Sequence, residues 1–76
     1  MATRRAFAER RQALVESIRQ AIRSGELQPG DLLPSLRALG SQHQLSHTTV
    51  AHELRRLTHE GVLRSVPSVG FVVGHA

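Results

Sequence analysis

The chain has 76 residues and no cysteine, and its ten basic residues, all of them arginine, exceed its six acidic residues to give a formal net charge of +4. This length allows one small domain, and the absence of cysteine excludes disulfides, thiolate zinc sites and cysteine nucleophiles. The arginine excess favours a polyanionic partner, because the planar guanidinium group can bind two phosphate oxygens at once. No apolar run approaches the roughly 20 residues that cross a bilayer, so we expect a cytoplasmic protein that does not bind a membrane.

The first ten residues are basic and poor in apolar side chains. We expect residues 1–10 to form a basic N-terminal arm, which is either frayed or the solvated start of a helix. From about Glu9 to Ser24, apolar residues recur at spacings of three and four, which predicts an amphipathic helix. Gly25 follows as a natural C-terminal cap. The apolar stripe of this helix consists of Leu14, Val15, Ile18, Ala21 and Ile22.

A strong turn signal, Pro29-Gly30, separates this helix from the next one. Proline presets its own φ and glycine tolerates a positive φ, which is what a tight turn requires. After the turn, Leu32 stands where a very short strand can form. Ser35 is the expected N-cap of a second, short helix, which ends near His43-Gln44.

A third helix is predicted from about His47 to Glu60, with Ser46 as its N-cap and Gly61 at its end. Just before it, Leu45 returns the chain to the core. The inward stripe of the helix consists of Val50, Leu54 and Leu57, with Ala51 beside it. The outer face is polar, which is typical of a helix that contacts another molecule.

After Gly61 the apolar pattern changes from a helical period to two β-prone segments, 62–66 and 70–73. They predict a hairpin whose loop runs from about Pro67 to Val69. The whole order indicates a mainly α fold with a small β-hairpin, that is, a winged helix-turn-helix of three helices plus a wing. We expect this domain to occupy residues 11–74, with 75–76 as a tail or the start of a linker.

One ordered pattern of residues runs through most of the chain. It begins with Ile22-x-x-Gly25-x-Leu27-x-Pro29-Gly30-x-x-Leu33-Pro34-Ser35-x-Arg37-x-Leu39. It continues in order with Leu45-Ser46-x-x-Thr49-Val50, then Leu54-x-x-Leu57-x-x-Glu60-Gly61-x-Leu63, then Gly70-Phe71-Val72. This pattern resembles the DNA-binding domain of the GntR family. The resemblance implies a winged helix of a bacterial transcription regulator that binds double-stranded operator DNA, usually as a homodimer on a palindromic site. We expect a fragment, which would dimerise through a C-terminal domain absent from this chain.

The third helix is the expected recognition helix, because its outer face can enter the major groove, where base edges are distinguishable. Its N-terminus offers amide N–H groups and a partial positive charge to phosphate. The resemblance implies a DNA-backbone contact for Arg37 on the second helix; otherwise Arg37 is simply solvated. Ser46 is either a cap alone or a cap that also binds phosphate. The predicted DNA-binding residues are Ser35, Arg37, Ser46, His47, Thr48, Thr49, Ala51, His52 and Arg55.

Several positions depart from the family pattern. His47 stands where the family commonly has arginine, and a histidine lacks the bidentate fork that reads guanine. Ala51 can contact a thymine methyl group but cannot form a hydrogen bond through its side chain. The wing tip carries no charge, and Gln44 occupies a position that is often glycine. Arg55 and Arg56 either reach the flanking DNA backbone or pair with Glu53 or Glu60 on their own helix.

The sequence contains no pattern that indicates an enzyme, a metal site or a cofactor. Its one aspartate lies in a turn, and it has no glycine-rich phosphate loop and no nucleophile elbow. His52 and His59 share a face but stand about 10 Å apart along the helix, too far to bind one ion. Two other functions remain open, a winged helix that binds a protein partner and a nonspecific nucleic-acid binder.

Overall fold

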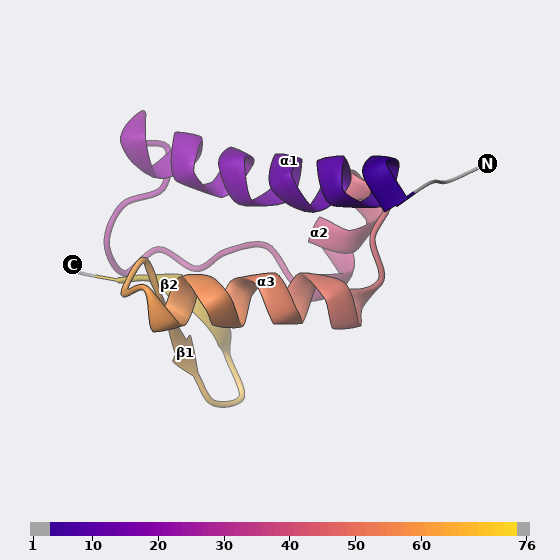
Figure 1. The fold of residues 1–76 in the computed structure, drawn as a ribbon. Helices are drawn as coiled ribbons and strands as arrows, with labels where there is room; N and C mark the ends of the chain where they lie inside the picture. Colours follow the sequence, from indigo (N-terminus) through magenta and orange to yellow (C-terminus); the bar gives the residue numbers. More distant parts are fainter. Residues whose placement is uncertain (1–3, 75–76) are drawn as a thin grey trace.

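The sequence folds into three helices and a two-stranded antiparallel sheet, in the order that its periodicities predict. The structure, a computed structural model, describes residues 4–74, so the outermost parts of the predicted arm and tail, 1–3 and 75–76, lie outside it. The elements are α1 (Arg4–Arg23), α2 (Leu36–His43), α3 (His47–His59), β1 (Leu63–Val66) and β2 (Gly70–Val73). Figure 1 shows α1 and α3 lying side by side with α2 behind them, and the hairpin extending from the C-terminal end of α3.

Helix α1 begins at Arg4, well before the predicted start near Glu9, so residues 4–10 form the first turns of a helix. Local contacts stabilise these turns. Arg5 pairs with Glu9 at 3.3 Å, one helical turn away. The guanidinium groups of Arg10 and Arg11 lie 5.9 and 5.1 Å from the centroid of the Phe7 ring. None of the described helices is long and apolar enough to cross a membrane.

The segment between α1 and α2 follows the edge of the hairpin. Leu32 forms a single β-bridge with Val72, which confirms the very short strand predicted there. The bridge is flanked by backbone hydrogen bonds from Leu33 to Phe71 and from Val73 to Asp31, each 2.9 Å long. The turn before it is closed by the side chain of Asp31, whose Oδ2 accepts a hydrogen bond from the amide of Gln28 at 2.9 Å. The hairpin is therefore tied to the connection between the first two helices.

The turn between α2 and α3 is very tight. A Cβ atom placed on Gly40 would lie 2.5 Å from the carbonyl oxygen of Leu45, a distance that leaves no room for any other residue. The backbone carbonyl of Gly40 accepts hydrogen bonds from the amides of Gln44 and Leu45. Gln44 adopts the left-handed conformation, with φ 56° and ψ 46°, which glycine tolerates best. This explains why the family pattern often places glycine at this position.

One hydrophobic cluster joins all the elements. It contains residues from each helix, from the connection before α2, from the turn after α2 and from both strands: Leu14, Ile18, Leu33, Leu39, Leu45, Val50, Leu54, Leu57, Leu63 and Val73. The predicted inward stripes of the first and third helices are thus confirmed. Because α3 contributes Val50, Leu54 and Leu57 to this cluster, its inner side is committed to the core and its opposite side faces solvent.

Two substitutions near the turn between α2 and α3 should have opposite effects on the stability of the protein. Replacing a helical glycine by alanine ordinarily stabilises a protein, but Gly40→Ala should destabilise this one by about 1–3 kcal/mol because of the contact with Leu45. Gln44→Gly should stabilise it by about 1 kcal/mol, because the strained left-handed residue is relieved. Urea denaturation of both variants measures the two effects. A more stable Gly40→Ala variant would contradict the close approach of the two helices.

Candidate nucleic-acid interface

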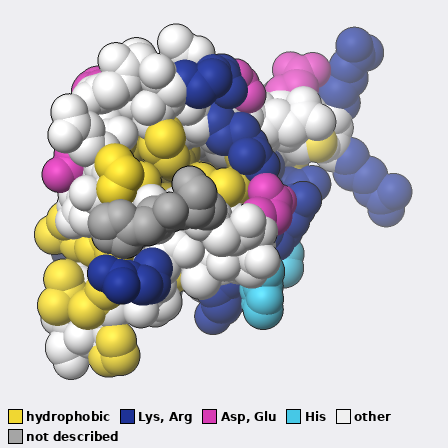
Figure 2. Space-filling view, turned by 90° about the vertical axis from the view of Figure 1, so that its left-hand side faces the viewer, with side chains coloured by type: hydrophobic (Ala, Val, Ile, Leu, Met, Phe, Trp, Pro, Cys, Tyr) yellow, Lys and Arg dark blue, Asp and Glu magenta, His cyan; other side chains and the backbone are white. Residues whose placement is uncertain are grey.

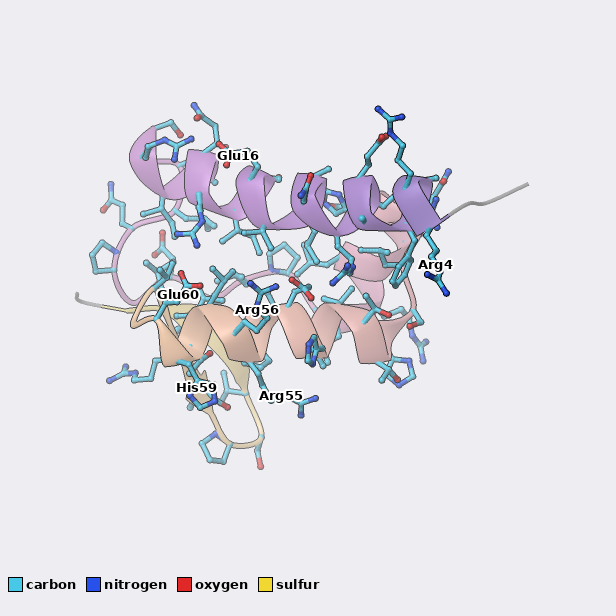
Figure 3. The ribbon with its side chains drawn as sticks, viewed as in Figure 1. Arg4, Glu16, Arg55, Arg56, His59 and Glu60 are labelled. Atoms are coloured by element: carbon cyan, nitrogen blue, oxygen red, sulfur yellow. The ribbon has the colours of Figure 1, made fainter. Side chains whose placement is uncertain are left out.

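Helix α3 presents one polar face to solvent. Thr48, His52 and Arg55 recur at spacings of four and three, and all three are exposed. Ala51, at the border of this face, is half-buried. Figure 3 shows the Arg55 and His59 side chains pointing away from α1, toward the side where the hairpin lies, whereas Arg56 points toward α1. The outer face predicted from the sequence is therefore continuous and accessible.

The N-terminus of α3 is closed by Ser46, as predicted. Its Oγ accepts a hydrogen bond from the amide of Thr49 at 3.2 Å and donates one to Thr49 Oγ1 at 3.0 Å. Thr49 is half-buried and so has a partly structural role. The amides of His47 and Thr48 lie in the first turn, where an α-helix has no carbonyl of its own to bond them. Those two N–H groups remain available to an anion at the end of the helix.

Helix α2, the turn after it and the first residue of α3 frame a shallow groove of about 670 Å³. Ser35, Arg37 and His47 all line it, so the structure brings together site residues predicted on two separate helices. Ser35 caps α2 in the same manner as Ser46 caps α3, because its Oγ accepts a hydrogen bond from the amide of Ala38 at 3.0 Å. Two capped helix N-termini and an exposed arginine thus converge on one side of the molecule, where their partial and full positive charges add.

The charges are distributed unevenly along the chain. From Leu32 to His52, the segment that holds α2 and the first half of α3, the sequence contains no acidic residue. Elsewhere, five arginines form ion pairs with acidic side chains: Arg5, Arg11, Arg19, Arg23 and Arg56. Within residues 4–74, by contrast, neither Arg37 nor Arg55 has an ion pair. These two guanidinium groups are therefore free to bind phosphate or a base.

The structure bears on one half of the alternative that the sequence left open for Arg55 and Arg56, the ion pair within their own helix. Nη1 of Arg56 lies 3.0 Å from Oε1 of Glu53, so Arg56 pairs within its own helix, and Arg55 does not. Sequence reasoning missed the burial of Glu53, whose side chain is only 2% exposed. The signal was present in the spacing, since Glu53 follows Val50 by three residues and precedes Leu57 by four, on the buried stripe.

The hairpin projects beside this face without a charged tip. β1 and β2 are antiparallel, with Arg64 opposite Val72 and Val66 opposite Gly70. Pro67, Ser68 and Val69 at the tip are exposed, as the sequence predicts for a loop. Figure 2 shows hydrophobic side chains gathered along the lower left edge of one face of the molecule. Arg64, on β1, is exposed and is a basic residue that the sequence analysis did not include in the site.

Comparisons with known proteins agree on one family. The model of "Bacterial regulatory proteins, gntR family" matches residues 10–73. The chain is 38% identical over 60 residues to the mannosyl-D-glycerate transport/metabolism system repressor of Escherichia coli, covering 79% of this chain and 25% of that protein. It is also 31% identical, with a TM-score of 0.75, to a possible transcriptional regulator from Bacillus subtilis, covering 86% of this chain and 28% of that one. The chain thus spans about a quarter of the length of these relatives.

A further solved structure contains DNA. It is that of the DNA-binding domain of AraR in complex with operator ORR3, with a TM-score of 0.79 and 26% sequence identity. The similarity covers 86% of this chain and 78% of that one. Together these neighbours show that the three helices and the hairpin form a winged helix-turn-helix, as the sequence predicts.

The Ser46 cap has a measurable contribution to stability. Ser46→Ala should destabilise the fold by about 1 kcal/mol, because the amide of Thr49 loses its hydrogen-bond acceptor. Ser41→Ala is the matched control, since Ser41 is exposed within α2 and caps no helix. Thermal unfolding followed by circular dichroism compares the two variants. Equal stability of both would show that the Ser46 hydroxyl does not cap α3.

Proposed function

Because the chain belongs to the gntR family of bacterial regulatory proteins, we propose that it recognises a specific operator sequence in duplex DNA with the outer face of α3. The family is one of DNA-binding transcription regulators and not of enzymes. One observation carries the proposal furthest: α2 and the first half of α3 contain no acidic residue, and neither Arg37 nor Arg55 has an acidic partner among the described residues. Such a surface attracts phosphate and repels no part of it.

The reading of bases is assigned to four side chains of α3. A helix with its side chains is about 10–12 Å wide and fits the major groove, which is about 12 Å wide. Arg55 has the planar fork that can bind both acceptors of a guanine. Thr48 and His52 can each hydrogen-bond a base edge, and Ala51 can contact a thymine methyl group. Their common exposure on one face supports this role.

The backbone contacts are assigned to the two helix N-termini. Ser35 and Arg37 lie at the start of α2, and Ser46, His47 and Thr49 at the start of α3. Amide N–H groups and serine hydroxyls at such ends bind phosphate oxygens and fix the register of a protein on the duplex. We assign Arg37 to a phosphate because it lines the groove between both helix ends.

We further propose that two copies bind one palindromic site in the cytoplasm. A single domain of this size makes few contacts and should bind a half-site weakly, whereas two linked copies gain affinity from each other's binding. A palindromic operator matches the two-fold symmetry of such a pair.

Selection of bound sequences from a random duplex pool tests the proposal directly. We expect a short motif, and an inverted repeat of it where two copies are linked. Binding to duplexes of every sequence alike would indicate a nonspecific nucleic-acid binder. Failure to bind any duplex at low salt would contradict the proposal and favour a winged helix that binds a protein partner.

Replacing Arg37 and replacing Arg55 should change different properties of DNA binding. Arg37→Ala should weaken binding to every duplex equally and reduce the slope of log affinity against log salt by about 1, because one phosphate contact is removed. Arg55→Ala should cost about 1–3 kcal/mol on the selected site and relax the preference at one base pair. Arg23→Ala, which removes the same charge from α1, is the control. If Arg23→Ala changes the salt slope as much as Arg37→Ala does, and base preference as much as Arg55→Ala does, the roles assigned to Arg37 and Arg55 are wrong.

A further inference from the structure

Glu53 is a carboxylate buried between α1 and α3. Its side chain is 2% exposed, although it neighbours the core residues Leu54 and Val50 on the inner side of α3. Its Oε1 accepts a hydrogen bond from Nη1 of Arg56 at 3.0 Å. Its Oε2 lies 3.6 Å from Nη1 of Arg11, which belongs to α1. The carboxylate therefore links the third helix to the first through two arginines.

This link is poorly suited to stabilising the fold. Burial of a carboxylate costs several kcal/mol of hydration, and ion-pair attraction returns this only where every oxygen is well bonded. Here Glu53 Oε2 and the Nε atom of Arg11 are buried without a hydrogen-bond partner. A cavity of about 220 Å³, lined by Ala8, Gln12 and Val15 as well as the three charged residues, lies beside them. An apolar side chain at position 53 would fill this space at lower cost.

The position of Glu53 on α3 gives the link a different consequence. At 3.6 residues per turn, Thr48 and Arg55 lie about 140–160° around the helix from Glu53, on the opposite side. Rotation of α3 by about 20° would move an atom about 5 Å from the axis by about 2 Å. Recognition of a ligand requires its contacting atoms to be held within about 0.5 Å. Whatever fixes the rotation of α3 therefore also fixes what Thr48 and Arg55 can reach.

We propose that Glu53 is a positioning residue for DNA recognition: its ion pair with Arg11 fixes the rotation of α3 against α1, and its ion pair with Arg56 holds that arginine away from the DNA. The apolar stripe sets which side of α3 is buried, and the buried carboxylate with its two arginine partners fixes the rotation of the helix within that limit. The inference rests on the proposed sequence-specific binding. It assigns to Glu53 an effect on discrimination between DNA sequences rather than on the strength of phosphate contacts.

The test compares the 76-residue chain with its Glu53→Gln and Arg11→Met variants and the double variant. Each is titrated with the selected duplex and with a scrambled duplex of the same length, and each is unfolded thermally. Glu16→Gln is the matched control, because it removes one negative charge from an ion pair on the exposed side of α1. It corrects for the gain in nonspecific affinity that the loss of any acidic group produces.

We expect each single variant to lower the ratio of selected to scrambled affinity by about fivefold to tenfold relative to the Glu16→Gln control. The salt slope of Arg11→Met should not change, because this variant leaves the ion pair between Glu53 and Arg56 in place. The slope of Glu53→Gln should steepen by up to about 1, because Arg56 is released toward the phosphates. The double variant should lose no more discrimination than Glu53→Gln alone, because Glu53→Gln already breaks the ion pair with Arg11. A role in folding alone would lower the melting temperature and leave the affinity ratio of the folded protein unchanged.

The outcomes separate the two proposals. If the wild-type chain prefers no duplex, the proposed function fails and this inference falls with it. If the wild type discriminates and the folded variants discriminate equally well, the inference alone is overturned. If both single variants are unfolded, Glu53 is required for folding, which also overturns a role confined to orientation.

Discussion

The structure depends on the burial of one side of α3. Val50, Leu54 and Leu57 enter a core that α1, α2 and both strands complete, so this helix has only one orientation in which its apolar stripe is covered. At about 25 cal/mol per Å² of apolar surface, burial of such side chains supplies the main driving force for folding. The polar face of α3 then has to be outside. The surface assigned to DNA follows from the packing of the opposite surface.

The distribution of charges also distinguishes the two sides of α3. Acidic residues pair with arginines on α1 and at the C-terminal half of α3, where they neutralise charge and hold elements together. The ion pair between Arg19 and Glu60, 2.7 Å long, ties the middle of α1 to the end of α3. The helix-turn-helix itself has no acidic residue before Glu53, so its arginines and helix ends keep their positive potential. Among the described residues the ion pairs therefore lie on α1 and at the C-terminal half of α3, whereas Arg37 and Arg55 have none.

Most of the fold was predictable because its determinants are local. The apolar stripes, the serine caps and the glycine and proline turns each act within a few residues, and the predicted positions agree with the structure to within a few residues, except at the start of α1. That start is set by the contacts of Arg5 with Glu9 and of Phe7 with two arginines, which leave no apolar stripe. The burial of Glu53 was missed although its place on the apolar stripe indicates it. The opposite directions of Arg55 and Arg56 were not predictable, because they depend on how α3 is rotated against α1.

The central claim is that one surface, formed by the N-terminus of α2 and the outer face of α3, contacts duplex DNA. The most direct measurement is the change in backbone amide NMR signals as the selected duplex is added to the labelled chain. The account predicts that the largest changes fall between residues 35 and 37 and between residues 46 and 55, with small changes from residue 16 to residue 23 on α1. Changes concentrated on α1 instead, with those of α3 unaffected, would contradict it.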